Sequence, residues 1–371
     1  MILLAIIALV VISYVSLILA YTLGLKRALS KNGDGAIGNI KLSVLVAFRN
    51  EEANLPVLLN ALLAQTLTHN SFDLIFVDDH STDNSLLVAQ SYCSKFQNLT
   101  ILSTPSTAKG KKAALVYGLS QASNPIIVFT DADCIPSKFW LEAISTSAAR
   151  GADFMIGAVV MNPVNSFSRK LQSLEYSSLM ATALGSCGIG HPVIASSANL
   201  AFRKSMLNVD SDSMNPTVSS GDDIFLLHRA KKLKNCRIEF LSDKRSIVQT
   251  STEATIAKAL RQRKRWASKS VFYKDFDTIY AGFVVLIFNL LIVSLLFASI
   301  FNVKYLFCFF TLLAVKSFVD YCLLNSYLKF TAQNKLLRIF LLLQLMYPFY
   351  IVYSFFLGVA IKGNWKGRSI N

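Results

Sequence analysis

Hydrophobic positions gather at the two ends of the chain. Residues 2–23 form an apolar run without a charged side chain, and three further runs cover approximately 279–301, 303–324 and 338–361. A helix needs about 20 consecutive apolar residues to cross a bilayer, and each run has this length. Polar and apolar residues are mixed between the ends. The pattern therefore predicts a globular domain between an amino-terminal membrane anchor and a carboxyl-terminal group of membrane helices.

The first run has the features of an uncleaved anchor. A signal peptide would have a basic start, a shorter apolar centre and a small-residue cleavage site, whereas here Lys26 and Arg27 follow the apolar run. Basic residues also precede the second run, at Arg261–Arg265. Because Lys and Arg collect on the cytoplasmic side of membrane proteins, we expect the globular domain in the cytoplasm and a multi-pass chain in the cell membrane.

Two ionisable residues, Lys316 and Asp320, interrupt the middle carboxyl-terminal run. Side chains four apart on a helix can pair on one face, and ionisable groups inside a membrane mark functional or helix-contact positions. The alternative is a helix that lies partly in the interface. Four spans would also place the basic residues of 362–368 outside, against the rule for basic residues, so a different number of spans stays open.

Charge and cysteine content narrow the partners and the compartment. The chain has 37 Lys and Arg but 22 Asp and Glu, and its net charge is +15. The basic residues crowd at stretches such as 231–234 and 261–265, where anionic lipid would contribute about 1 kcal/mol per charge. Since no nucleic-acid motif stands near them, we expect an anionic membrane and no nucleic acid as the partner. Six cysteines without CxxC spacing suit a reduced cytoplasm.

Short apolar runs that favour β-strands alternate with polar clusters and helical stretches in the middle of the chain. The runs are Leu42–Phe48, Phe72–Val77, Thr100–Leu102 and Ile126–Phe129. Such alternation predicts an α/β fold with a mostly parallel sheet covered on both faces. Ligands of these sheets bind beyond the carboxyl ends of the strands, so the residues after each run are the candidates for chemistry.

Charged clusters follow the first three runs. Glu51 follows the first run, and Asp78 and Asp79 follow the second. These carboxylates suit a turn or a helix cap, but at a strand tip they can also bond the N3–H of uracil or ribose hydroxyls. Lys109–Lys112 then opens a helix, where lysine opposes the helix dipole. A bound diphosphate would explain these lysines, and a solvated surface turn is the alternative.

Asp131 and Asp133 follow the fourth run directly, with one small residue between them. Two carboxylates at this spacing converge on one hard cation, which also bridges phosphate oxygens. After a buried strand, the pair carries a desolvation penalty that a purely structural role would not offset. We therefore expect Mg²⁺ or Mn²⁺ here, where it would neutralise the charge of a nucleoside diphosphate leaving group.

Taken in order, these motifs resemble the inverting glycosyltransferases of family two, which have a GT-A fold. The resemblance covers approximately residues 40–270 and includes Gly221-Asp222-Asp223 and Gln262-Arg263-Lys264-Arg265-Trp266. It implies a Rossmann-like, mostly parallel domain. The implied domains are an anchor at 1–25, a GT-A domain at 40–275 and a transmembrane region at 276–371.

The resemblance also implies a role for each matched residue. The residues that it assigns to the nucleotide-sugar donor are Glu51, Asp78, Asp79, Lys111 and Asp131. Asp131 and Asp133 would hold the metal. The family usually has Glu-Asp where this chain has Asp222-Asp223, and Asp223 would be the general base that deprotonates the acceptor hydroxyl. The alternative is that this acidic pair caps the helix that follows it.

Gln262, Arg265 and Trp266 match the Gln-x-x-Arg-Trp motif of the processive branch of the family, which includes synthases of cellulose, chitin and hyaluronan. A tryptophan face can stack on a sugar ring, and an arginine can grip a pyrophosphate bidentately. The alternative is a basic amphipathic helix on the membrane surface, with Trp266 at the interface. Ser196–Arg203 resembles an acceptor-side segment, although the family often has glycine at the serine positions.

We therefore expect a membrane-bound inverting glycosyltransferase that moves a sugar from a nucleotide-diphospho-sugar, with UDP as the expected nucleotide, to a glycan or lipid acceptor. The alternative is a polyprenyl-phosphate or glycolipid sugar transferase that adds a single sugar. The basic face favours the lipid acceptor, whereas the Gln262–Trp266 motif favours repeated addition. An aspartyl phosphatase is disfavoured because its Asp-x-Asp follows the first strand, and a non-catalytic partner because no acidic motif is lost.

Overall fold

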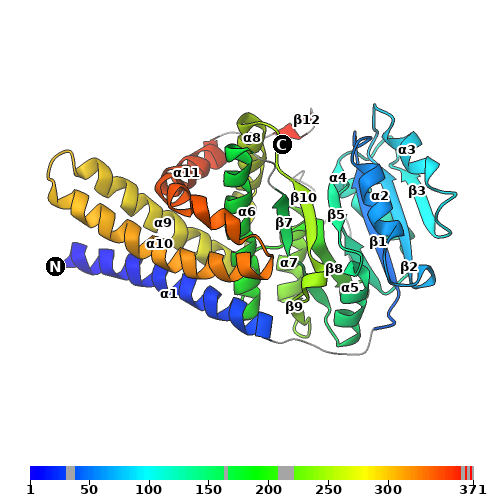
Figure 1. The fold of residues 1–371 in the computed structure, drawn as a ribbon, viewed down its shortest axis with the longest axis horizontal. Helices are drawn as coiled ribbons and strands as arrows, with labels where there is room; N and C mark the ends of the chain where they lie inside the picture. The colour runs from blue at the N-terminus through cyan, green and yellow to red at the C-terminus, as the bar shows by residue number, and fades with distance from the viewer. Residues whose placement is uncertain (31–37, 163–165, 208–220, 361–363, 366–367, 370–371) are drawn as a thin grey trace. The chain divides into compact units, whose positions relative to one another are not determined.

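The computed structural model of the protein describes residues 1–30, 38–162, 166–207, 221–360, 364–365 and 368–369 (Figure 1). The chain divides into two compact units. The sheet unit comprises residues 29–162 and 195–251, and the helical unit comprises 1–28, 163–194 and 252–370. The predicted GT-A domain covers residues 40–275. Two stretches of it, 163–194 and 252–275, belong to the helical unit.

A seven-stranded sheet, counted over the described residues, forms the centre of the sheet unit, in the order β3-β2-β1-β4-β8-β6-β9. Its strands are β1 (Leu42–Phe48), β2 (Phe72–Asp78), β3 (Leu99–Ser103), β4 (Ile126–Phe129), β6 (Phe154–Ile156), β8 (Leu200–Arg203) and β9 (Ile238–Phe240). Strands β1 to β4 pair in parallel, and β8 pairs antiparallel with β4 and β6. The predicted α/β class and its four parallel strands are therefore confirmed.

A smaller sheet lies in the same unit, with the order β5-β10-β7. It consists of β5 (Cys134–Pro136), β10 (Val248–Ser251) and β7 (Val159–Asn162). Because β5 begins directly after the Asp131–Asp133 pair, the smaller sheet fixes the chain on the far side of the predicted metal motif. These three strands were not predicted from the sequence.

The helices of the sheet unit connect its strands. Among the described residues they are α2 (Leu55–Leu63), α3 (Ser85–Ser91), α4 (Lys111–Gln121), α5 (Trp140–Ala149), α7 (Asp222–Lys232) and the 3₁₀ turns η1 (His69–Ser71), η2 (Ser197–Asn199) and η4 (Lys244–Ser246). Helix α4 packs tightly on the sheet, because an added Cβ at Gly118 would lie 2.2 Å from Leu45 Cδ1 and 2.9 Å from Val77 Cγ2. This packing holds the second half of α4 against β1 and β2.

Asn199 ties the core of the sheet unit together. Its Nδ2 donates to the carbonyl oxygens of Ala158 at 2.9 Å and Ser246 at 2.8 Å, and its Oδ1 accepts from Trp140 Nε1 at 2.9 Å. Gly157 must be glycine, because an added Cβ would lie 2.1 Å from Asn199 Nδ2. The Trp140 side chain is fully buried and belongs to this core.

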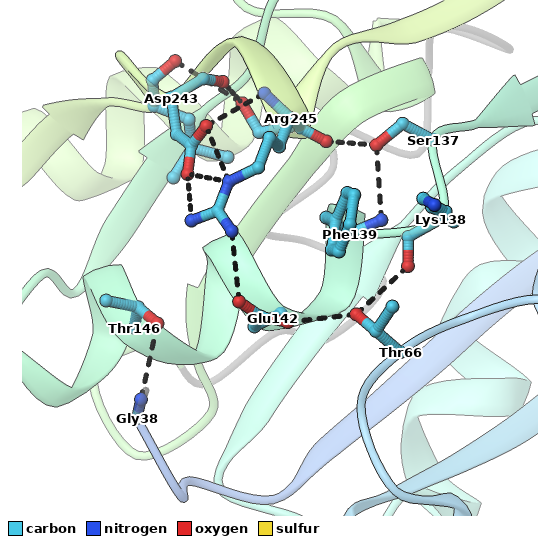
Figure 2. Close-up of polar contacts among 11 residues, drawn as sticks. Gly38, Thr66, Ser137, Lys138, Phe139, Glu142, Thr146, Asp243 and Arg245 are labelled. Carbon is cyan, nitrogen blue, oxygen red and sulfur yellow. Dashed lines mark hydrogen bonds and ion pairs between the residues drawn. The ribbon is translucent and has the colours of Figure 1, made fainter. Parts of the chain in front are cut away.

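A polar cluster holds η4 against α5, as Figure 2 shows. Arg245 pairs with Asp243 at 2.8 Å and with Glu142 at 3.2 Å, and its guanidinium lies 5.4 Å from the centre of the Phe139 ring. Glu142 also accepts from Thr66 Oγ1 at 2.9 Å. The cluster fixes the segment that leads into β10.

The helical unit contains the long apolar helices. Its elements, over the described residues, are α1 (Ile2–Ser30), α6 (Phe167–Gly188), α8 (Ile256–Ala267), η5 (Ser270–Phe272), α9 (Phe276–Ala298), α10 (Lys304–Phe330), η6 (Asn334–Ile339), α11 (Phe340–Ala360), β11 (Asn364–Trp365) and β12 (Arg368–Ser369). Within this unit α9 packs against α10 and α11 (Figure 1). In the described part of the chain, four segments are long and apolar enough to cross a membrane, which confirms that expectation: Leu4–Ser30, Phe276–Ala298, Lys304–Phe330 and Asn334–Phe356.

Glycines bring α1 and α6 into backbone contact. An added Cβ at Gly24 would lie 2.2 Å from the carbonyl oxygen of Gly185, and one at Gly188 would lie 2.1 Å from the carbonyl oxygen of Gly24. One at Gly185 would lie 2.5 Å from the carbonyl oxygen of Tyr21. Small residues allow apolar helices to approach closely, so these glycines set the spacing of the two helices.

The expected Lys316–Asp320 pair is confirmed and belongs to a larger network. Lys316 is fully buried, and its Nζ donates to Asp320 Oδ2 at 2.6 Å and to Gln344 Oε1 at 2.8 Å. Asp320 also accepts from Tyr14 Oη at 2.7 Å. Tyr14 in turn stacks on Phe288, with the ring centres 4.1 Å apart. The network therefore joins α1, α9, α10 and α11.

Candidate active site

The predicted metal motif lies directly after β4, at the carboxyl end of the parallel strands. Asp131, Asp133 and Cys134 each have one potential ligand atom within 4.8 Å of the others. Burial raises the pKa of the Cys134 thiol well above its usual value, so the thiol stays protonated at neutral pH and is a poor ligand. The two carboxylates fit a hard divalent cation that prefers oxygen.

Asp133 lies in a strongly negative environment. Burial and the charges of Asp131 and Glu51 raise the pKa of Asp133 to about 6. Its Oδ2 accepts a hydrogen bond from Thr250 Oγ1, in the smaller sheet, at 3.4 Å. Carboxylates that repel one another in this way are stabilised by a nearby cation. The effect of Glu51 on this pKa also places the carboxylate that follows β1 near the metal motif.

Lys111 brings a positive charge into this group from the first turn of α4. Its Nζ donates to Asp131 Oδ1 at 2.5 Å and to Ser197 Oγ at 2.8 Å, and lies 3.6 Å from Asp222 Oδ2. Burial alone would lower the pKa of Lys111, but the carboxylates of Asp131 and Asp222 raise it above its usual value. The lysine therefore stays charged and joins α4, β4 and α7.

The acidic pair Asp222 and Asp223 occupies the first turn of α7. Gly221 precedes it with φ of 93°, a left-handed conformation that glycine adopts without strain. Asp222 is buried, whereas Asp223 accepts from the backbone amides of Ser197 at 3.4 Å and Ile224 at 2.8 Å. Both carboxylates thus lie in the first turn of the helix, where the capping alternative places them. They also lie close to the ammonium group of Lys111.

The carboxylates after β1 and β2 make local contacts. Both oxygens of Asp78 accept from the backbone amide of Ser81, at 3.1 and 3.3 Å. Asp79 Oδ1 accepts from the amide of Gly110 at 2.8 Å, and Glu51 Oε2 accepts from Asn54 Nδ2 at 2.7 Å. Asp79 therefore fixes the loop that carries Lys111, and Asp78 shapes the turn after β2. Their contribution to nucleoside binding stays a prediction.

The Gln-x-x-Arg-Trp motif lies on α8, which belongs to the helical unit. Gln262 Nε2 donates to Glu253 Oε1 at 3.4 Å. The Trp266 ring lies 5.9 Å from that of Tyr176, and the guanidinium of Arg263 lies 4.3 Å from the centre of the Trp266 ring. Trp266 therefore packs on neighbours within its own unit. The structure places the three motif residues within the helical unit: Gln262, Arg265 and Trp266. Their contact with the donor or the acceptor stays a prediction.

Arg263 and Glu175 form a buried ion pair that was not predicted from the sequence. Arg263 Nε donates to Glu175 Oε2 at 2.9 Å, and both side chains are buried. Burial would lower the pKa of Arg263, but the Glu175 carboxylate raises it. The pair joins α8 to α6. The signal in the sequence was Glu175 itself, the one acidic residue of α6. A carboxylate buried among apolar and small residues requires a cationic partner.

Comparisons with known proteins agree with this architecture. Residues 43–209 match the model of glycosyl transferase family 2. The glycosyltransferase AglE of Haloferax volcanii is 28% identical over 182 residues, which cover 49% of this chain and 58% of that protein. An undecaprenyl-phosphate 4-deoxy-4-formamido-L-arabinose transferase of Photorhabdus laumondii subsp. laumondii is 29% identical over 147 residues, which cover 39% of this chain and 45% of that protein. The matches thus span about half the length of these relatives.

A solved structure shares the fold. The mannosyltransferase PcManGT from Pyrobaculum calidifontis, determined in complex with GDP-Man and Mn²⁺, aligns with a TM-score of 0.51 and 16% identity. The alignment covers 93% of this chain and 98% of that chain. At this identity the likeness concerns the fold. Together, the mostly parallel sheet, the acidic residues at its strand ends and this structural likeness show a GT-A-like fold, and residues 43–209 within it are similar to the glycosyl transferase family 2 model.

Proposed function

We propose that the protein is a membrane-bound inverting glycosyltransferase that takes its sugar from a nucleoside-diphospho-sugar. One observation carries this proposal. Asp131 and Lys111, which lie in the region similar to the family 2 model, converge with the acidic pair at the start of α7 at the carboxyl end of the sheet. In parallel sheets this edge is where ligands bind.

The donor half of the site is assigned to the residues at the strand ends. Asp131 and Asp133 would hold Mg²⁺ or Mn²⁺, which would neutralise the charge on the departing diphosphate. The mannosyltransferase structure contains Mn²⁺ and GDP-Man, and this supports a metal in the present chain. The residues proposed to bind the nucleotide-sugar are Glu51, Asp78, Asp79, Lys111 and Asp131.

The acceptor half of the site is assigned to the start of α7. Asp223 would accept the proton of the acceptor hydroxyl as its oxygen attacks the anomeric carbon from the face opposite the diphosphate. The new carbon–oxygen bond forms as the bond to the diphosphate breaks, and the diphosphate leaves with the electron pair. Asp222, buried beside Lys111, would fix the position of this turn.

A lipid or glycan acceptor at the cytoplasmic membrane face suits this chain. Four candidate membrane helices support a membrane location, and one relative is an undecaprenyl-phosphate sugar transferase. This relative favours addition of a single sugar to a polyprenyl phosphate as the second candidate function. Gln262, Arg265 and Trp266 would contact the acceptor or the diphosphate in either case.

Release of nucleoside diphosphate tests the proposal. The purified protein, in detergent with native lipid, is incubated with a panel of nucleotide-sugars and with Mg²⁺ or Mn²⁺. We expect Asp131→Asn and Asp223→Asn each to reduce release at least about 100-fold, as loss of a charged catalytic group does. The number of sugars on the product distinguishes single from repeated addition.

A matched control separates chemistry from folding. Asp243→Asn removes a carboxylate from the same unit, where it caps η4 and pairs with Arg245. This variant should retain its turnover. Undiminished turnover in both Asp131→Asn and Asp223→Asn would refute the assigned roles.

A further inference from the structure

Lys111 and the proposed metal ion require the same carboxylate. Asp131 Oδ1 already accepts a charge-assisted hydrogen bond from Lys111 Nζ at 2.5 Å. Asp131 is also one of the two carboxylates that fit a divalent cation. An ammonium group and a divalent cation repel each other at this short range, and each weakens the hold of the carboxylate on the other.

The ammonium group is held in place from several sides. Ser197 Oγ accepts from Lys111 Nζ at 2.8 Å, and Asp222 Oδ2 lies 3.6 Å away. Four-fifths of the Lys111 side chain is buried, with 20% exposed, and that of Asp222 is 4% exposed. In these buried surroundings water screens Coulomb interactions only weakly, so the ammonium group interacts more strongly with its neighbours than an exposed lysine would.

The backbone at Lys111 is fixed, whereas its side chain can move. Gly110 has φ of 98° and donates its amide to Asp79 Oδ1, so the start of α4 is anchored to the end of β2. The ammonium group is a point charge on four methylene groups and makes no strict geometric demand on its partner. It can therefore exchange one anionic partner for another without a change of fold.

We propose that Lys111 competes with the divalent cation for Asp131 and that the donor diphosphate ends this competition by becoming the partner of the ammonium group. This inference rests on the proposed function and extends it to the order of binding. Metal alone binds weakly, because it must displace the ammonium group from Asp131. Donor and metal bind together, since the diphosphate supplies negative charge to both cations.

Metal affinity in the absence of nucleotide is the decisive quantity. Direct coordination of metal by the diphosphate would couple the two ligands even without competition from Lys111. Only competition predicts that removing the lysine charge tightens the binding of metal alone. A lysine that simply binds phosphate predicts weaker nucleotide binding and unchanged metal binding.

The experiment measures Mn²⁺ binding to the full chain in detergent, from the paramagnetic resonance signal of free Mn²⁺, without nucleotide and with UDP or GDP. We expect Lys111→Gln and Lys111→Met to bind Mn²⁺ alone about 10-fold more tightly than wild type, within the usual range of coupling between sites. Lys111→Arg keeps the charge and should stay within about 3-fold of wild type. Lys109→Gln removes an exposed charge from the same loop and is the matched control.

The outcomes separate this inference from the proposed function. Mn²⁺ affinity that is unchanged or weaker in both neutral variants would overturn the competition, even if UDP or GDP still enhances Mn²⁺ binding to wild type. Tighter binding in the Lys109→Gln control would also overturn it, because the effect would then come from net charge. Failure of wild type to bind Mn²⁺ with either nucleotide would instead refute the proposed metal site. Thermal unfolding of each variant verifies that it is folded, and either neutral variant tests the inference by itself if the other unfolds.

Discussion

Asp79 organises the loop that carries Lys111. Its Oδ1 accepts the amide of Gly110 at 2.8 Å, and its backbone amide donates to the carbonyl oxygen of Phe48 at 2.9 Å. Burial raises the pKa of Asp79, although the bond from Gly110 and the charge of Arg49 favour the ionised form. Desolvation therefore outweighs these two favourable interactions in setting the pKa of Asp79.

Asp79→Asn should change the pH dependence of stability. A carboxyl group with a higher pKa in the folded than in the unfolded state destabilises the fold once pH exceeds the unfolded value, and the loss grows until pH passes the folded value. Asparagine removes this charge but keeps an oxygen that can accept from Gly110. We expect the Tm of the variant to rise relative to wild type as pH increases above about 4, the unfolded value of the carboxyl group. Thermal unfolding of both proteins at a series of pH values measures this Tm difference. A Tm difference that does not vary with pH would contradict the prediction.

At the scale of residues, motifs predicted individual side chains better than the contacts between them. Lys111 and Asp131 were both expected in the donor site, but nothing in their spacing indicated that they pair. Ser197, which joins them, is 66 residues from Asp131, and the pairing of β8 with β4 brings it there. Contacts of this kind depend on the order of strands, which local sequence does not encode.

At the scale of elements, the length of a repeated pattern decided what could be predicted. The four parallel strands and the four long apolar segments carry enough apolar residues to be recognised. Strands β5, β7 and β10 have three or four residues each, too few to establish an alternating pattern. The contact of α6 with α1 was also not predicted, because it depends on isolated glycines that form no recognisable sequence pattern.

The α1–α6 crossing predicts the effect of a single methyl group. Gly24→Ala should lower stability by about 1–3 kcal/mol, because the new Cβ would collide with the backbone of α6 and push the helices apart. Gly282→Ala on α9 is the matched control, since an added Cβ there meets no atom within 4 Å. Alanine at Gly282 should leave stability equal or raise it by up to about 1 kcal/mol. Thermal unfolding in detergent compares the two, and equal effects would contradict close packing at Gly24.

At the scale of the whole molecule, hydropathy predicted which segments form long helices, and a polar network joins these helices within the helical unit. Tyr14 comes from the amino-terminal helix, whereas Lys316, Asp320 and Gln344 come from the carboxyl-terminal helices. Sequence spacing predicted the Lys316–Asp320 pair because both residues lie on one helix. It could not identify Tyr14 or Gln344, since their helices are distant in the chain.

Breaking the Lys316–Asp320 pair should harm the protein more than replacing both residues. Lys316→Met leaves a largely buried carboxylate, 16% exposed, without its cation, which costs up to about 3 kcal/mol. The double variant Lys316→Met, Asp320→Asn removes both charges and should recover much of this loss. Unfolding in detergent of the two single variants and the double variant gives the coupling. A double variant as unstable as the sum of the single variants would contradict the pairing.

The hydrogen bond from the Gly110 amide to Asp79 also bears on the entropy of ligand capture. It fixes the loop that carries Lys111 to the end of β2 before any ligand binds. A loop that is already ordered loses little conformational freedom on binding, so more of the contact energy appears as affinity. Loss of this bond would allow the loop to sample many conformations, and the donor would then have to select one of them.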